Sequence, residues 1–299
     1  MADVNAAQTS AEMQTAINDP SLGLNLTKFN MLIPSLQNDV LAGLLRNRPT
    51  LGYVTMPDLQ DMLDYEVTMV QTEVYLDNIF VQSGATGGNG SLTKPFGTIP
   101  DGISAVNPGG TVHILAGEYP ISENIVVNKN GITLSGEPGN RLVQIKESVT
   151  PLFISGSNVT IQNLNVTSDK DYLGALIEVA GDNVTLRNNQ IYGLTNSGAV
   201  NRGILLGTKV GIVVENNHIH SLSQGIGISS GAVGNVNNNH IEGTQTGIFV
   251  SSGSMSIMGN YWSGIKNGVC DIGLMSNIAQ YYDTDQLSID NNTAFVRVF

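Results

Sequence analysis

Residues 184–189 read Val-Thr-Leu-Arg-Asn-Asn, and residues 212–217 repeat this pattern as Ile-Val-Val-Glu-Asn-Asn. Related stretches begin at Ile132, Val159, Asn235 and Met255. The central aliphatic residues of the six stretches are Leu134, Ile161, Leu186, Val214, Val236 and Ile257, in steps of 27, 25, 28, 22 and 21 residues. A period of about 20–30 residues is typical of a protein built from stacked repeats.

A second sequence motif recurs with nearly the same spacing as the first. Glycines followed by aliphatic residues occur at positions 174, 203, 225, 247 and 268, in steps of 29, 22, 22 and 21 residues. Each repeat therefore contains at least two short strands, and each strand pairs with its copies in the neighbouring coils, about 4.8 Å away. The sequence predicts an all-β parallel β-helix over residues 75–270, with roughly seven coils and a core of Val, Ile and Leu.

The two ends of the chain differ from this pattern. Residues 1–74 are predicted to form a helical segment, because apolar residues recur at helical spacing after the capping candidates Ser10, Ser35 and Thr55. This segment is interpreted either as a cap that packs on itself or as an oligomerisation or docking module. Residues 271–299 are interpreted as a C-terminal cap, with a strand donated to a neighbouring chain as the alternative.

Composition narrows the range of partners. The net charge is -12, from 25 acidic and 13 basic residues, which disfavours binding to nucleic acid or to anionic membranes. The same charge disfavours an anionic polysaccharide unless a divalent cation bridges the two. Because Cys270 is the single cysteine, no intrachain disulfide can form.

The sequence shows neither a signal peptide nor a long apolar run. The sequence therefore assigns no localisation. The expectation is a protein made in the cytoplasm, with assembly onto a spore, a cell surface or a virion as the open possibility.

The segment before the coils carries a family resemblance. It contains Pro-Phe-Gly-Thr-Ile (95–99), Pro-Gly-Gly-Thr-Val (108–112) and Ala-Gly-Glu-Tyr (116–119), followed by Asn-rich repeats. This order resembles the start of the pectin-lyase-like right-handed parallel β-helices, in the style of their Asn-rich, NosD-like members. The resemblance implies a single-stranded right-handed β-helix. That superfamily includes polysaccharide lyases, glycoside hydrolases, phage tailspikes and proteins without known catalysis, so the resemblance leaves the activity open.

Asparagine fills two adjacent positions in three successive coils and one position in the next. The predicted structural Asn ladder consists of Asn188, Asn189, Asn216, Asn217, Asn238, Asn239 and Asn260. Asparagine tolerates left-handed backbone geometry at turns, and stacked amides can hydrogen-bond to one another.

Two outward columns follow the asparagines. The predicted register brings His218, His220, His240 and Glu242 together on one face, with Tyr192 nearby. Three His and one Glu can bind a transition metal or serve as an acid/base pair. The alternative is a solvated polar stripe without chemistry.

A lengthened loop supplies a weaker metal candidate. Asp169 and Asp171, with Glu178 or Asp182, could hold Ca²⁺ through oxygen ligands. The chain lacks the Asn-Thr-Asp, Gly-His-Gly and Arg-Ile-Lys motifs of polygalacturonase-type hydrolases. The sequence predicts no cofactor, and it leaves open whether the chain binds Ca²⁺ or a transition metal.

The sequence favours a non-enzymatic structural protein. It would associate with itself through its terminal segments into a bacterial surface, spore-associated or phage-appendage assembly, because no catalytic set is recognisable. The alternative is a carbohydrate-binding or carbohydrate-active β-helix, a polysaccharide lyase or hydrolase, that uses the His/Glu face or Asp171.

Overall fold

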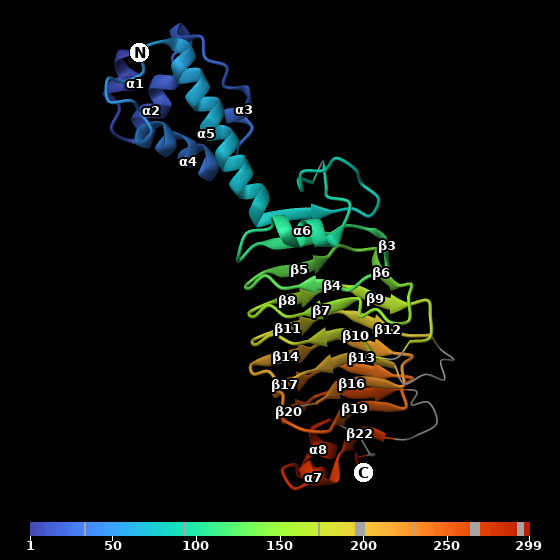
Figure 1. Ribbon diagram of the computed structural model, residues 1–299. Helices are drawn as coiled ribbons and strands as arrows, with labels where there is room; N and C mark the ends of the chain where they lie inside the picture. The colour runs from blue at the N-terminus through green and yellow to red at the C-terminus, as the bar shows by residue number, and fades with distance from the viewer. Residues whose placement is uncertain are drawn as a thin grey trace. The chain divides into compact units, whose positions relative to one another are not determined.

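The computed structural model describes residues 1–32, 34–92, 94–172, 174–194, 201–229, 231–263, 270–291 and 296–299. The chain divides into two compact units, Met1–Tyr75 and Leu76–Phe299. The first unit is helical and the second is built from strands (Figure 1). No helix in the described ranges has the length and apolar character needed to cross a membrane.

The N-terminal unit is a set of helices with its own core. Its elements are α1 (Ala2–Ala6), α2 (Ser10–Ile17), η1 (Pro20–Leu22), α3 (Thr27–Asn30), α4 (Pro34–Arg46) and α5 (Met56–Asp77). Apolar side chains from α2, α4 and α5, such as Met13, Leu41 and Leu63, are buried against one another. These helices therefore bury their apolar faces within the unit, because isolated amphipathic helices need a surface to pack on.

Two helix boundaries differ from the prediction. Thr9, not Ser10, caps α2, because Thr9 and Glu12 form a reciprocal capping box. The β-helix is predicted to begin at residue 75, but α5 continues to Asp77, and the first strand, β1, begins at Asn78. At Thr55 the expected cap is present, since Asp58 N donates to the Thr55 hydroxyl and Thr55 N donates to the Asp58 carboxylate.

Arg48 ties the first helix to the rest of the N-terminal unit. Its Nη1 donates to the carbonyl oxygens of Val4, Asn5 and Ala7, at 3.1, 2.9 and 2.8 Å. We expect Arg48→Met to destabilise this unit by about 2 kcal/mol, because hydrogen bonds from a charged group are worth roughly 1.5–3 kcal/mol. Urea unfolding followed by far-ultraviolet circular dichroism measures this. The exposed Arg46→Met is the matched control, and an equal loss in both variants would contradict the prediction.

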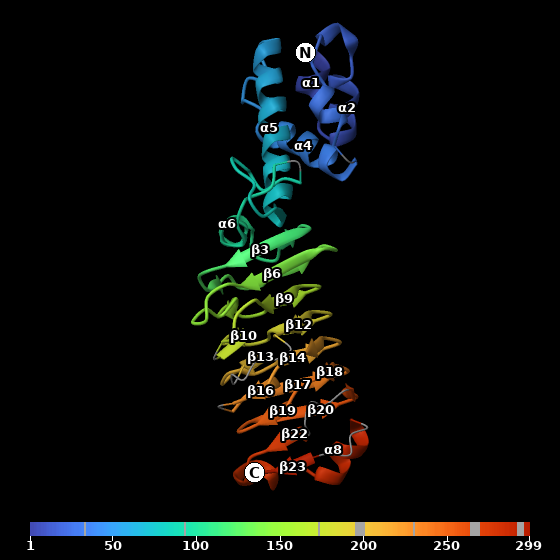
Figure 2. The same cartoon turned by 90° about the vertical axis from the view of Figure 1, so that its right-hand side faces the viewer.

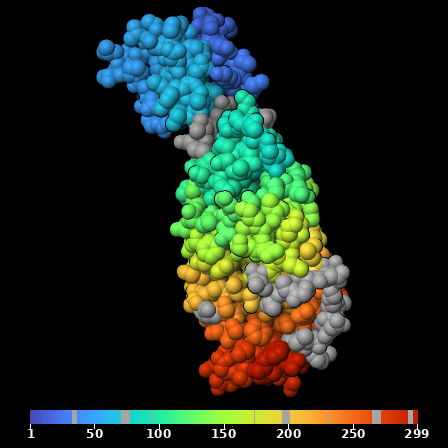
Figure 3. Space-filling model, turned by 45° about the vertical axis from the view of Figure 1, so that its right-hand side comes forward, coloured from blue at the N-terminus to red at the C-terminus, as the bar shows by residue number. Residues whose placement is uncertain are grey.

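The second unit is a parallel β-helix of three sheets, which confirms the predicted fold class. Figures 1 and 2 show the strands of each sheet lying one above another. In Figure 3, successive coils of residues 76–299 follow one another as bands of colour. Each coil has three strands where the sequence indicated at least two, because a third short strand follows each Asn turn.

Each sheet takes one strand from each successive coil. The first sheet holds β1 (Asn78–Val81), β2 (Thr111–Ile114), β5 (Thr133–Gly136), β8 (Thr160–Gln162), β11 (Thr185–Arg187), β14 (Ile212–Glu215), β17 (Val233–Asn237) and β20 (Ser254–Met258). The second holds β4 (Ile125–Val127), β7 (Leu152–Ile154), β10 (Gly174–Val179), β13 (Asn201–Leu206), β16 (Gln224–Ile228), β19 (Thr246–Val250), β22 (Cys270–Leu274) and β23 (Val296–Val298). The third holds β3 (Gly117–Ile121), β6 (Asn140–Gln144), β9 (Asn165–Ser168), β12 (Gln190–Tyr192), β15 (His218–His220), β18 (His240–Glu242) and β21 (Tyr261–Ser263).

The register stacks the predicted aliphatic column. Leu186 lies opposite Ile161 on one side and Val214 on the other, and Val214 lies opposite Val236. All four side chains are fully buried and belong to one continuous core cluster. Because side chains alternate along a strand, the neighbours of each core residue face outward, and this alternation positions the polar columns of every sheet.

The two asparagine columns have different roles. Asn188, Asn216 and Asn238 are exposed and adopt left-handed φ angles of 55°. The buried residues that follow them form the ladder: Asn189 Nδ2 donates to Asn217 Oδ1, Asn217 Nδ2 to Asn239 Oδ1, and Asn239 Nδ2 to Asn260 Oδ1, each at 2.9 Å. The first column thus turns the chain, and the second links one coil to the next.

The start of the stack carries one short helix. Helix α6 (Ile99–Ala105) is capped by the Thr98 hydroxyl and buries Ile99 and Ile103 in the β-helix core.

The C-terminal segment continues the stack and then closes it. Gly268 and Val269 of the second sequence motif lie outside the described residues, but β22 buries Ile272 and Leu274 and extends the coils past residue 270. Strand β23 pairs in parallel with β22, so the tail covers its own coil. Helices α7 (Ser276–Ala279) and α8 (Thr284–Asp290) complete this end, and α8 packs beside β20 and β23.

Candidate functional site

The third sheet presents two outward columns. His218 on β15 lies opposite His240 on β18, and His220 lies opposite Glu242. The residues between them, Ile219 and Ile241, are buried in the core. The structure therefore brings the predicted His and Glu side chains to one face of two neighbouring strands.

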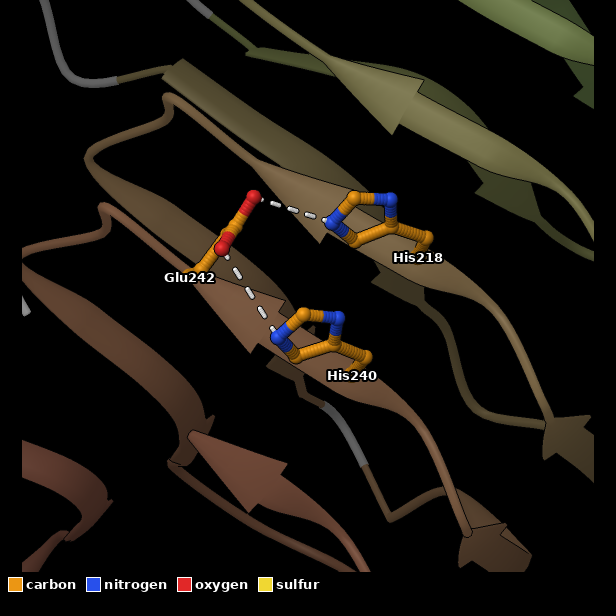
Figure 4. Close-up of side chains that lie close together, drawn as sticks. All are labelled: His218, His240 and Glu242. Atoms are coloured by element: carbon orange, nitrogen blue, oxygen red, sulfur yellow. Dashed lines mark hydrogen bonds and ion pairs between the residues drawn. The ribbon is translucent and has the colours of Figure 1, made fainter. Parts of the chain in front are cut away.

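Glu242 is the centre of the cluster (Figure 4). Its Oε1 lies 3.1 Å from His218 Nε2, and its Oε2 lies 3.7 Å from His240 Nε2. The Ser263 hydroxyl on the next strand donates to Glu242 Oε2 over 2.9 Å and lies 2.8 Å from His240 Nε2. The three side chains remain reachable from solvent, with exposed fractions of 38% for His218, 24% for His240 and 37% for Glu242.

The rings of this face stack along the sheet. His218 and His240 are parallel with centroids 4.6 Å apart, and His240 stacks on Tyr261 at 4.2 Å. Beside them, Tyr192 stacks on His220 at 4.8 Å, and His220 lies 4.8 Å from His218 at a tilt. The in-register spacing of a parallel sheet produces these stacks, since equivalent side chains repeat about every 4.8 Å.

The electrostatic environment disfavours the charged forms of His220 and His240 and favours the ionised form of Glu242. Burial, with the charge of His218 as a smaller contribution, lowers the pKa of His220 and of His240. The hydrogen bond from Ser263, assisted by His218, lowers the pKa of Glu242. An ionised carboxylate can accept hydrogen bonds or bind a cation, and a neutral imidazole can accept a proton or ligate a metal.

The face extends further than the sequence indicated. Arg141 on β6 pairs with Glu118 on β3 at 2.6 Å, and its Nε donates to the Tyr192 hydroxyl at 3.3 Å. The hydrogen bond to Tyr192 reaches across β9, which no pattern of neighbouring residues could predict. We call the contacting series from Glu118 to Tyr261 the outward run; its members are Glu118, Arg141, Tyr192, His220, His218, His240 and Tyr261.

The other predicted candidates do not join this cluster. Asp169 and Asp171 lie exposed in the loop between β9 and β10. Within the described residues, His218, His240 and Glu242 are the one group of three donors close enough to share an ion. His220 is not one of these three donors, and its Nδ1 lies 3.1 Å from the Ser221 hydroxyl.

Comparison with known proteins supports the architecture. A family model described as "Right handed beta helix region" matches residues 110–294. Over 71 residues, 24% of the chain, the sequence is 42% identical to a curated protein named Gellan lyase from Bacillus sp, and the match spans 3% of that protein.

Several solved structures are similar in fold. Pectate lyase Pel9A aligns with a TM-score of 0.44 and 15% identity, over 66% of this chain and 68% of that chain. The pectin methylesterase from Aspergillus niger aligns with a TM-score of 0.39 and 12% identity, over 67% and 75%. The activities in these names belong to those proteins.

Proposed function

Because the chain belongs to the right-handed β-helix family, we propose that the outward face of its third sheet binds a polysaccharide. The observation that carries this proposal is the outward run, in which each side chain from Glu118 to Tyr261 contacts the next. The run crosses seven strands, and six spacings of about 4.8 Å give it a length of roughly 29 Å. Such a surface suits an extended polymer better than a small molecule.

The chemistry of the run supports a sugar ligand. Tyrosine and histidine rings offer an apolar body with a polar tip, and Arg141, Glu118 and Glu242 supply charged hydrogen-bonding groups. The net charge of -12 repels a densely anionic polymer, which favours a polysaccharide with few charges. The local identity to a protein named Gellan lyase supports the same ligand class.

Binding is better supported than hydrolysis. Glycoside hydrolysis normally uses two carboxyl groups, about 5–9.5 Å apart. Among the strands of the third sheet, carboxylates occur at Glu242 on β18 and at Glu118 on β3, five strands away. Proton transfer by His240 or Glu242 is the second candidate, because these two groups meet beside Ser263.

This proposal reverses the order of the two interpretations that the sequence alone favoured. Association of the chain with itself through its terminal segments stays a prediction. The carbohydrate interpretation ranks first, because the family match, the local sequence identity and the outward run all support it.

The test is affinity electrophoresis of the full-length protein in gels containing a panel of neutral and uronate-containing polysaccharides. We expect Tyr261→Ala to weaken binding roughly fivefold, because an exposed aromatic contact is worth about 1 kcal/mol. Tyr261 is 51% exposed at one end of the stack. The matched control is Tyr281→Ala, at a tyrosine that is 75% exposed but outside the third sheet.

Two results would contradict the proposal. The first is that no polysaccharide of the panel retards the protein in the gel. The second is that both tyrosine variants weaken polysaccharide binding equally. The same mixtures are assayed for new reducing ends and for the absorbance of unsaturated products. Turnover that disappears in Glu242→Gln would extend the proposal from binding to catalysis.

A further inference from the structure

The His218/His240/Glu242 cluster has the donor set of a metal centre. Two imidazole nitrogens and one carboxylate oxygen come from neighbouring parallel strands, and all three donor atoms lie within 4.8 Å of one another. Both Nε2 atoms are directed at the carboxylate (Figure 4). We infer that these three residues form a site for one divalent transition metal ion of the zinc class.

The distances are close to those that a bound ion would require. Zinc binds imidazole nitrogen at about 2.0–2.1 Å and carboxylate oxygen at about 2.0–2.2 Å, so tetrahedral ligand atoms lie roughly 3.3 Å apart. The observed separations are 3.1 Å from Glu242 Oε1 to His218 Nε2 and 3.7 Å from Glu242 Oε2 to His240 Nε2. The two imidazole rings are parallel, so they would turn toward a common point to bind one ion together with the carboxylate.

The surroundings restrict the orientation of the ligands. His240 is stacked between His218 and Tyr261, and the Ser263 hydroxyl contacts both His240 and Glu242. Such supporting contacts orient the ligands of metal sites. The solvent-exposed side of the cluster leaves room for water or another ligand at the remaining position of the ion.

The ligand set also selects the kind of ion. Imidazole nitrogen suits Zn²⁺, Cu²⁺ and Ni²⁺, whereas Ca²⁺ takes six to eight oxygen ligands. The site therefore differs in chemistry from the oxygen-ligand candidate at Asp169 and Asp171, which the sequence left open for Ca²⁺. It also requires no polysaccharide, so it stands whether or not the outward run binds a sugar.

The experiment is isothermal titration of untagged full-length protein, freed of metal by a chelator, with Zn²⁺ alone. We expect one ion per chain. Substituting Co²⁺ should give the intense visible absorption of a four-coordinate ion. We expect Glu242→Gln and His240→Ala to weaken Zn²⁺ binding by at least the roughly 10–100-fold that the loss of a supporting partner costs.

The matched control is His113→Ala, which removes a histidine of β2 in the first sheet, outside the outward run, and should leave Zn²⁺ binding unchanged. Glu242→Gln preserves the size of the side chain, and Trp262 fluorescence reports whether each variant is folded. The inference is overturned if Zn²⁺ does not bind stoichiometrically, if folded Glu242→Gln binds as tightly as the unmodified protein, or if His113→Ala loses as much affinity as His240→Ala. Preference for Ca²⁺ over Zn²⁺ would also overturn it.

Discussion

Replacing Asn217 with leucine is expected to lower the free energy of unfolding of the β-helix by about 4 kcal/mol. Asn217 Oδ1 accepts from the backbone and side-chain nitrogens of Asn189, and its Nδ2 donates to Leu186 O and Asn239 Oδ1. Leucine fills a similar volume and keeps water out, so several buried polar groups lose a partner at roughly 1–3 kcal/mol each. The loss of stability is large because the side-chain amide of Asn217 forms hydrogen bonds that join three successive coils.

The measurement is urea unfolding followed by Trp262 fluorescence. Trp262 is the single tryptophan of the chain and packs against the β-helix core, so its signal reports the second unit. The control is Asn235→Leu, the same chemical change at an exposed position of the next coil. A loss below about 1 kcal/mol for Asn217→Leu, the worth of one ordinary hydrogen bond, would show that the amide column contributes little to stability.

The second large effect is expected from Leu186→Ala. Leu186 is fully buried between Ile161 and Val214, so truncation leaves a cavity in the middle of a continuous column. Buried Leu→Ala changes cost about 2–5 kcal/mol, and we expect about 3 kcal/mol for this one. The same Trp262 unfolding curve measures the change.

Thr185→Ala is the control for this second substitution. Thr185 precedes Leu186 on β11, and its side chain faces outward. We expect less than about 1 kcal/mol from its removal, as for most surface changes. Equal effects at positions 185 and 186 would contradict the assignment of Leu186 to the core.

Most of the stack could be predicted from the sequence, because its spacing is set by a repeated interaction. A parallel coil must return to the same aliphatic residue, so the spacing of Leu186, Val214 and Val236 indicates their register. The alternation along a strand then places His218 and His240 side by side. Such local sequence patterns are enough to predict a contact between two residues that lie one coil apart.

The remaining features depend on contacts that skip a coil or follow no period. Arg141 reaches Tyr192 across an intervening strand, which depends on the length of one side chain. Helix α5 continues to Asp77, past the predicted start of the β-helix at residue 75, because helix propagation adds a hydrogen bond for each residue fixed. The role of Ser263 could not be predicted either, since a serine in a polar column has many ordinary explanations.

The final rung of the amide ladder comes from a residue that does not follow the repeat pattern. Asn260 donates to Asn291 Oδ1 at 2.8 Å, and Asn291 follows helix α8 instead of another Asn turn. During synthesis on the ribosome, the earlier rungs can close after 28, 22 and 21 further residues. The rung from Asn260 closes after 31 further residues, and only once helix α8 has been made. Until Asn291 folds onto the coil of Asn260, that coil presents an open strand edge, which is prone to pair with other chains.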